Sequence, residues 1–208
     1  MELKKYPLDE FCGIMGSDAP APGGGSAAAL AGAVGAALCS MVAALTVGKP
    51  KYAEFEDLAE RCGKKAQALQ WELLDAIDKD CAAFNGFKAA MALPKNTDEE
   101  KAVRTAAMQA ALRICTESPL SIMELSRNAL YLTSALIGRS NASASSDLGV
   151  SALMLKAALQ GAWLNVLINI GSLKDPELAD EYRARGEAIL EEALPTADEI
   201  YQTVASSL

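Results

Sequence analysis

Carboxylates are the residues best able to do acid–base chemistry in this sequence, because its 208 residues include no histidine. Without an imidazole that titrates near neutrality, proton transfer must come from a perturbed carboxylate, a lysine, a cysteine, a tyrosine or bound water. The same absence excludes histidine-based catalytic triads and most zinc sites, and we expect no metal site. Candidate catalytic groups are therefore acids that face an apolar environment.

Asp80 is such an acid. On a helical wheel at about 100° per residue it lies about 20° from Leu73 and about 40° from Phe84, on the apolar face of its helix. Asp78 points away from that face. A carboxylate facing the core needs a partner or a raised pKa. Both a functional acid and a structural aspartate paired with a neighbouring helix fit this requirement.

Asp147 is a second candidate, at the start of the helix that follows the polar loop GRSNASASSD. At that position the helix dipole stabilises a negative charge. Acids are also common in the first helical turn for structural reasons, so the position alone favours a structural role.

Two amides lie four residues apart in GAWLNVLINI, an otherwise apolar segment. Asn165 and Asn169 share one helix face with Gly161. Buried amides need hydrogen-bond partners, which are either backbone groups of the protein or the polar edge of a ligand.

Lysines follow two of the predicted helices. Lys49 and Lys51 come directly after a long uncharged segment, and Lys95 with Asn96 lies in a break marked by Pro94. The helix dipole favours lysines near helix C-termini, and these side chains could equally hold the carboxylates of an anionic substrate.

The uncharged segment runs from Ala19 to Gly48 and contains three consecutive glycines. GGGSAA formally satisfies the dinucleotide-binding pattern GxGxxA, but the prolines before it do not fit the buried strand that this motif requires. The GK[ST] of a Walker loop is missing. What remains is either a simple turn into a helix or one wall of a ligand pocket, formed by Gly23, Gly24, Gly25 and Ser26.

The segment from Ser26 to Val47 is long enough to cross a bilayer, but it consists mostly of alanine and glycine, which contribute little transfer energy. We predict instead a buried central helix, which could also serve a subunit interface. Its small residues form a smooth strip against which a neighbouring helix or a ligand can pack closely: Ala28, Gly32, Ala36 and Ser40.

The rest of the sequence has helical periodicity and no strand or hairpin pattern, so the predicted fold is all-α, with one domain over residues 1–208. Further helices are predicted over about 52–93, 97–117, 118–137, 147–170 and 175–208. Their starts are marked by a capping box at Thr97 and Glu100, by Ser118–Pro119, by Ser145 or Ser146, and by Asp175. Pro195 should kink or divide the last helix.

The composition is 51% hydrophobic with a formal charge of −8 and no basic cluster, which argues against binding to nucleic acid or to an anionic membrane. The five cysteines never form CxxC and lie among apolar neighbours, as is typical of reduced thiols. The N-terminal MELKKYPLDEF has no apolar signal core, so we expect a cytoplasmic protein.

Five segments together resemble the formiminotransferase-cyclodeaminase family, in particular its stand-alone bacterial methenyltetrahydrofolate cyclohydrolases: PAPGGGSAAALAGAVGAAL, LTVGKPKY, LPKNTDEEK, SNASASSDLGVSAL and NVLIN. The resemblance spans essentially the whole chain, and PGGGS with LPKNT is its most specific combination. It includes the family's GK-K-Y at Gly48–Tyr52, its D-AF at Asp80–Phe84 and its SD at Ser146–Asp147. The sequence departs from the family in GRSNASASSD, where Arg139 and extra small residues alter a loop that often reads like GN-N.

The resemblance implies a multihelical, dimeric enzyme that acts on the one-carbon bridge between N5 and N10 of tetrahydrofolate. Some members close 5-formimino-tetrahydrofolate to the methenyl form with loss of ammonia, and others hydrolyse the methenyl form to 10-formyl-tetrahydrofolate. The absence of a fused transferase domain favours the cyclohydrolase. A cyclodeaminase and a non-catalytic folate-binding or helical dimer protein remain alternatives, and no cofactor is expected besides the folate substrate.

The resemblance also implies roles for the acid–base candidates. Methenyl-tetrahydrofolate carries a delocalised amidinium cation, which Asp80 or Asp147 would stabilise while helping to deprotonate the attacking water. Lys49 would donate a proton as N5 leaves.

The remaining candidates would bind the substrate. Asn165 and Asn169 suit the amide-like edge of the pterin, and Lys51 and Lys95, beside Asn96, suit the glutamate tail. The glycine turn would then be a wall of the folate pocket.

Overall fold

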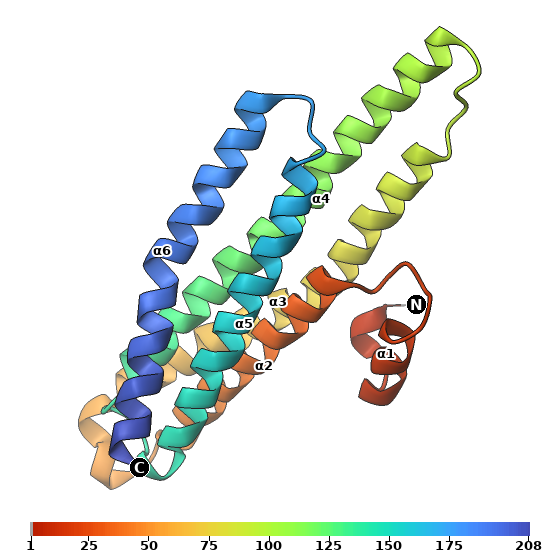
Figure 1. The fold of residues 1–208 in the computed structure, drawn as a ribbon. Helices are drawn as coiled ribbons and strands as arrows, with labels where there is room; N and C mark the ends of the chain where they lie inside the picture. Colours follow the sequence, from red (N-terminus) through yellow and green to blue (C-terminus); the bar gives the residue numbers. More distant parts are fainter. Residues whose placement is uncertain (1) are drawn as a thin grey trace.

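Five long helices lie side by side along most of their length (Figure 1). In the computed structural model, which describes residues 2–208, they are α2 (Gly24–Ala44), α3 (Glu56–Met91), α4 (Asp98–Leu136), α5 (Ser145–Ile170) and α6 (Pro176–Ser207). The shorter elements are η1 (Leu3–Lys5), α1 (Leu8–Met15), η2 (Pro50–Phe55) and η3 (Ala142–Ala144). Residues 2–208 contain no β-strand, so the all-α prediction is confirmed.

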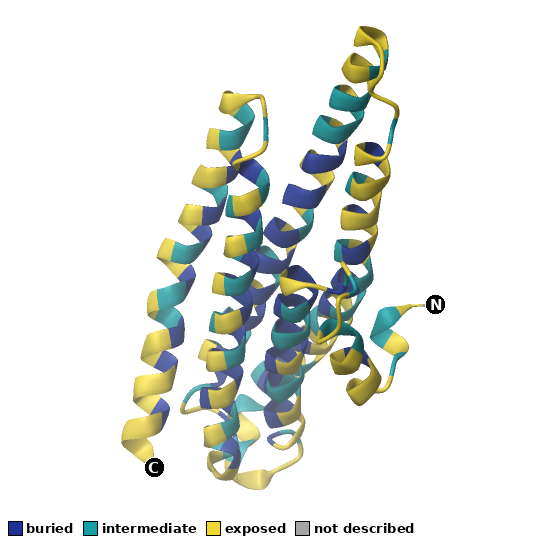
Figure 2. Cartoon of the chain, turned by 45° about the vertical axis from the view of Figure 1, so that its right-hand side comes forward, coloured by how far each residue is buried: buried dark blue, intermediate teal, exposed yellow. Residues whose placement is uncertain are grey.

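The helices α3, α2, α5 and α6 are neighbours in that order, and α4 packs against all four of them. Buried residues follow the sides on which the helices face one another, whereas the end of α3 and the start of α4 project beyond the bundle and are mostly exposed (Figure 2). The core therefore lies where α2, α4 and α5 meet.

The strip of small residues predicted on α2 is present and allows close packing against other helices. A Cβ added at Gly32 would lie 2.9 Å from Ser126 Oγ in α4. Gly35, beside the predicted strip, is packed as closely: a Cβ added there would lie 2.6 Å from Leu155 in α5. Larger side chains at these positions would push the helices apart, so the prediction of a central, closely packed helix is confirmed.

α4 is one helix, so the prediction of a helix break at Ser118–Pro119 is wrong. Pro119 is buried inside α4. Because proline has no N–H, the carbonyl of Cys115, four residues earlier, loses its helical donor. The side chain of Asn169 in α5 donates to this carbonyl at 2.6 Å, which satisfies the oxygen within a continuous helix.

Other helix boundaries also differ from the prediction. α3 begins at Glu56 and not at about Tyr52, since Pro50–Phe55 form η2. α6 runs through Pro195, which is exposed, so of the two predicted outcomes, a kink or a division, the helix is not divided. α5 begins at Ser145 directly after η3, and the local side-chain cap is Asn141, which accepts from the Ser143 N–H. Two predicted caps are confirmed: the capping box of Thr97 with Glu100, and Asp175 at the start of α6.

By length and composition, two helical segments could cross a membrane: Gly24–Ala44, with a mean hydropathy of 1.9, and Ala142–Ile170, with 1.3. About 50% and 39% of their residues, respectively, are buried inside the bundle. Core helices of bundles in water pass the same test, so this finding is weak evidence for a span. That the chain does not enter a membrane stays a prediction.

The segments GKPKY and SNAS lie together at the C-terminal end of α2. Thr46 Oγ1 accepts from the Asn141 N–H at 2.9 Å, and the Tyr52 hydroxyl accepts from the Ala142 N–H at 3.0 Å. Gly48 has a φ of 73°, in the left-handed region that glycine adopts readily, and turns the chain after the helix. These contacts fix the lysine-bearing turn to the loop between α4 and α5.

Candidate functional site

Asp80 projects from α3 towards the N-terminus of α2. Its Oδ2 accepts a hydrogen bond from Ser26 Oγ at 2.8 Å, and the Ser26 backbone N–H also donates to the carboxylate. Ser26 is fully buried in the first turn of α2, whereas Asp80 is partly buried. Burial raises the pKa of Asp80, although the hydrogen bonds from Ser26 act in the opposite direction. As the helical wheel predicts, this acid faces inwards.

The glycine turn allows α2 to begin directly against this carboxylate. Gly23 precedes the helix with extended backbone, and Gly24 and Gly25 form its first turn. A Cβ on Gly25 would lie 2.2 Å from Asp80 Oδ1, which is closer than two such atoms can approach. Position 25 must therefore be glycine for Asp80 to keep its place.

Asn165 and Asn169 of α5 point to the same region. Asn165 Nδ2 donates to the Gly161 carbonyl at 2.8 Å, and Asn169 Nδ2 donates to the Cys115 carbonyl. Within residues 2–208, neither amide oxygen accepts a hydrogen bond. The protein thus satisfies one donor of each amide and leaves both oxygens available to a ligand.

These groups line one cavity of about 250 Å³, which we call the Asp80 cavity. Its wall contains six of the predicted site residues: Gly23, Gly24, Gly25, Asp80, Asn165 and Asn169. A seventh, Ser26, lies directly behind Asp80. The other lining residues are Pro20, Ala21, Ala83, Phe84, Cys115 and Ile168.

None of these six residues is among the predicted site residues. The sequence places Phe84 in the core, but its side chain is 40% exposed at the cavity. Phe84 follows Asp80 by four residues, so the helical spacing could have identified it. Cys115 and Ile168 have no distinguishing sequence signal, because only tertiary packing brings them to the cavity.

Three other predicted site residues lie at the opposite end of α2. Lys49 and Lys51 follow its C-terminus, and Asp147 lies in the first turn of α5. α2 has 21 residues and is therefore about 30 Å long, so these side chains cannot reach the Asp80 cavity of the same chain. Lys51 instead lies over the Tyr52 ring, 5.3 Å from its centre, and lines a separate hollow of about 470 Å³.

Lys95 and Asn96 lie in the exposed turn between α3 and α4. The Asn96 N–H donates to the Glu100 side chain at 2.7 Å. Since α3 continues for eleven residues beyond Asp80, this turn lies about 16 Å or more from it along the helix. The structure does not bring the two residues to the cavity.

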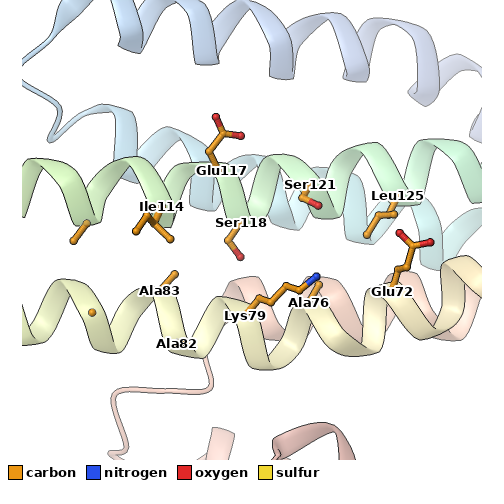
Figure 3. Close-up of a pocket in the computed structure, with 12 residues that line it drawn as sticks. Glu72, Ala76, Lys79, Ala82, Ala83, Ile114, Glu117, Ser118, Ser121 and Leu125 are labelled. Carbon is orange, nitrogen blue, oxygen red and sulfur yellow. The ribbon is translucent and has the colours of Figure 1, made fainter.

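A larger hollow is a groove of about 510 Å³ between α3 and α4 (Figure 3). Ala83 and Ile114 line it, and Ser118 points from α4 towards α3. Glu117, at its edge, is paired with Arg185 at 3.2 Å. The smaller Asp80 cavity is the better candidate site, because it combines a partly buried acid, a helix N-terminus and two free amide oxygens.

Comparison with known proteins gives consistent matches over most of the chain. Residues 7–188 match the family model described as Formiminotransferase-cyclodeaminase. The chain is 41% identical to the methenyltetrahydrofolate cyclohydrolase of Methylorubrum extorquens over 201 residues, 97% of each protein. It is 35% identical to the formimidoyltransferase-cyclodeaminase of Gallus gallus over 191 residues, which is 92% of this chain and 35% of that longer protein.

Its fold is similar to the crystal structure of formiminotetrahydrofolate cyclodeaminase from Thermotoga maritima. The TM-score is 0.81 at 27% sequence identity, over 99% of this chain and 96% of the other. This likeness extends over all the helices described above.

Proposed function

The chain belongs to the formiminotransferase-cyclodeaminase family, and we propose that it is a methenyltetrahydrofolate cyclohydrolase that hydrolyses 5,10-methenyl-tetrahydrofolate to 10-formyl-tetrahydrofolate in one-carbon metabolism. The observation that carries the proposal is the full-length similarity to a cyclohydrolase at 41% identity. The Asp80 cavity supports it, because it supplies groups that this reaction needs.

Asp80 is the proposed acid–base residue. As a carboxylate it stabilises the amidinium cation and accepts a proton from the water that attacks the bridge carbon. The neutral adduct then collapses to the formyl group: its hydroxyl proton passes to N5, and the bond between N5 and the carbon breaks. A raised pKa favours proton acceptance by Asp80 over that of an ordinary aspartate.

The rest of the cavity binds the pterin in this proposal. The oxygens of Asn165 and Asn169 accept from N–H groups of the ring, and Phe84 offers an aromatic face against which the ring can stack. The glycine turn allows the ring to approach the backbone at the start of α2.

A cyclodeaminase is the second candidate function. Relatives named as cyclodeaminases share the fold and the family, and both reactions involve the same bridge carbon. A folate-binding protein without turnover is a third. The identity to the cyclohydrolase is higher than to either cyclodeaminase described above, which favours the first candidate.

The experiment that separates these candidates offers both folates to the purified chain. We expect the near-ultraviolet absorbance of methenyl-tetrahydrofolate to fall faster than in buffer alone, with no turnover of 5-formimino-tetrahydrofolate. Formation of the methenyl compound from the formimino compound would identify a cyclodeaminase. Folate binding without either reaction would leave the binding role.

We also propose that the chain is a homodimer and that α2 and α5 form its interface. Both helices expose apolar side chains on the side away from α4: Val34, Met41, Leu45, Val150, Leu153, Leu164 and Ile168. α2 carries no charge, and the two charges of α5 are Asp147 at its start and Lys156, which is paired with Asp198 of α6. We call this surface the α2–α5 face.

The size and composition of the α2–α5 face suit a second copy of the chain. Two adjacent helices, about 30 Å and about 40 Å long, present an area comparable with the roughly 800 Å² that each partner buries in a standard interface. Uncharged apolar surface of this extent is more typical of a subunit interface than of a surface in water.

A two-fold axis perpendicular to the helices would also explain how the lysines, which lie far from the Asp80 cavity of their own chain, could reach a cavity. Such an axis lays the C-terminal end of one α2 over the N-terminal end of the other, because the contact is the same in both directions. Lys49, Lys51 and Asp147 of one subunit would then lie near the Asp80 cavity of its partner. A parallel arrangement would instead place the lysines of both subunits together.

The setting of the reaction completes the proposal. Residues 2–208 hold no group of three or more His, Cys, Asp or Glu side chains that could bind a metal, and the reaction as written needs no cofactor. All five cysteines are free thiols, which suits the reducing cytoplasm. Neither nucleic acid nor membrane is a proposed partner.

A further inference from the structure

Two prolines lie inside long helices, and each leaves one backbone carbonyl without its helical donor. Pro195 is on the exposed side of α6, and Glu191, whose carbonyl it frees, is exposed as well. Pro119 is buried in α4, and the carbonyl that it frees belongs to Cys115, in the wall of the Asp80 cavity. A buried carbonyl needs a donor from within the protein.

That donor is Asn169, whose Nδ2 lies 2.6 Å from the Cys115 oxygen. Asn169 lines the same cavity. We propose that Pro119 is a positioning residue, which fixes the Asn169 amide in the cavity with its oxygen free to face the ligand. The nature of the ligand rests on the function proposed above, whereas the hydrogen bond does not.

The orientation of the amide follows from the chemistry of its partner. A backbone carbonyl only accepts hydrogen bonds, so the Asn169 group that faces it must be the NH₂. The Asn169 oxygen lies on the other arm of the planar amide and accepts nothing from residues 2–208. An ordinary residue at position 119 would add a backbone N–H aimed at the same carbonyl, in competition with Asn169.

The amide of Asn165 has the same orientation relative to its partner, because its Nδ2 donates to the Gly161 carbonyl and leaves its oxygen free. The cavity therefore presents two amide oxygens and the Asp80 carboxylate, and all three are acceptors when the acid is ionised. Such a wall selects a ligand edge made of N–H donors, as in an amino-pyrimidinone ring. An analogue that lacks those donors would leave buried acceptors unpaired, which weakens binding strongly.

The first test is Pro119→Ala. Alanine restores the helical N–H, which competes for the Cys115 carbonyl and loosens Asn169. We expect KM for the folate to rise about fivefold, the effect of one ordinary hydrogen bond, with kcat within about twofold. The matched control is Pro195→Ala, which restores an N–H on the exposed side of α6 and should leave both constants unchanged.

Stability separates positioning from a general structural role. Pro119→Ala should be as stable as the parent or more stable, because alanine favours a helix interior and the carbonyl keeps a donor. The rise in KM should also disappear when Pro119→Ala is made in an Asn169→Ala background, because the two residues act through one bond. A full fivefold rise in that background, or no rise in the parent, would overturn the proposal.

A readout without turnover keeps this inference distinct from the proposed function. The chain has six asparagines, so ¹⁵N-asparagine labelling gives few side-chain NH₂ signals, and the Asn169 pair is the one lost in Asn169→Ala. This pair should shift in Pro119→Ala and not in Pro195→Ala. An unchanged pair would refute the positioning role even in an active enzyme. If the Asn169 NH₂ signals shift in a protein that turns over no folate, the proposed enzymatic function is refuted and the positioning role of Pro119 stands.

Discussion

At the scale of single residues, the candidate site depends on one acid placed where an acid is unfavourable. Asp80 is partly removed from water and, among residues 2–208, receives only the hydrogen bonds of Ser26 in return. Desolvation outweighs these hydrogen bonds, so the pKa of the carboxyl is raised. A group kept at a cost to stability is typical of a functional site.

This cost leads to a prediction for Asp80→Asn. A raised pKa means that the folded state binds the proton more tightly than the unfolded state, so ionised Asp80 lowers the free energy of unfolding. This loss of stability is absent below pH 3.8, the ordinary pKa of aspartate, where the carboxyl is protonated in both states. It grows as the pH rises from 3.8 to the raised pKa of Asp80 in the folded state. Asp80→Asn should therefore be more stable than the parent at pH 7 and lose this advantage near pH 3.5, as measured by urea unfolding at each pH.

Two results would argue against that view of Asp80. One is a variant less stable than the parent at pH 7, which would mean that the Ser26 hydrogen bonds outweigh desolvation. The other is a stability difference that does not change with pH. Asp18→Asn serves as a control for the removal of a charge alone, because Asp18 is exposed before α2 and its carboxylate makes no hydrogen bond or ion pair with residues 2–208.

Helical periodicity alone makes Asp80, Asn165 and Asn169 candidates, since each is a polar residue on an apolar helix face, and the structure brings all three to one cavity. The sequence leaves open whether the asparagines bind the backbone or a ligand. In the structure each amide donates to one backbone carbonyl, and its oxygen accepts nothing from residues 2–208. Periodicity predicts a core position for Phe84, because it gives the direction of a side chain and not what covers it.

At the scale of helices, the contact between the start of α2 and the middle of α3 decides whether the site forms. Gly25→Ala would place a Cβ 2.2 Å from Asp80 Oδ1, so the carboxylate must move. We expect more than tenfold loss of kcat/KM and a loss of about 1–3 kcal/mol in the free energy of unfolding, as for other overpacked contacts.

The matched control is Gly13→Ala in α1, where an added Cβ meets nothing within 4 Å. It should keep full activity and gain up to about 1 kcal/mol from helix propensity. Equal activity of Gly25→Ala and the parent enzyme would show that the close contact with Asp80 is not needed.

Helix boundaries were predictable where the signal is local and not where it is distant. The capping box at Thr97 and the Asp175 cap depend on residues three apart, and both are confirmed. The predicted break at Pro119 is wrong because the carbonyl that the proline frees is satisfied by Asn169, 54 residues from Cys115 in the sequence. A rule that considers only neighbouring residues cannot include that partner.

At the scale of the whole molecule, the predicted site residues fall into separate regions of one chain. The acid, the glycines and the amides share one cavity, whereas Lys49, Lys51 and Asp147 lie about 30 Å away. No sequence pattern gives such distances. A second subunit on the α2–α5 face is the proposed way to bring the two groups together.

The dimer predicts the effect of a charge on the α2–α5 face. Leu153 is 45% exposed and lies outside the Asp80 cavity. Leu153→Glu would place a carboxylate in an apolar interface without a partner, so the chain should become a monomer in sedimentation and light scattering. Val103→Glu, at a 64% exposed position on α4, is the control and should leave the mass unchanged. A parent chain that is already monomeric would contradict the proposed interface.

A shared site also predicts complementation between subunits. Asp80→Asn and Lys51→Ala should each have low activity alone. When the two variants are unfolded and refolded together in equal amounts, half of the dimers contain one subunit of each variant. Each of these mixed dimers has one intact site out of two, so the mixture should have about a quarter of the parent activity. A mixture no more active than its components would mean that the lysine and the acid act within the same chain or that the lysine is not used.

The most direct test of the proposed function and of the role of Asp80 is the rate of methenyl-tetrahydrofolate hydrolysis, followed by absorbance, for the parent chain and for Asp80→Asn under the same conditions. We expect hydrolysis well above the spontaneous rate for the parent and a kcat lower by about 10²–10⁴ for a variant that remains folded. Full turnover by folded Asp80→Asn would remove Asp80 from the chemistry. No hydrolysis by the parent would contradict the cyclohydrolase itself.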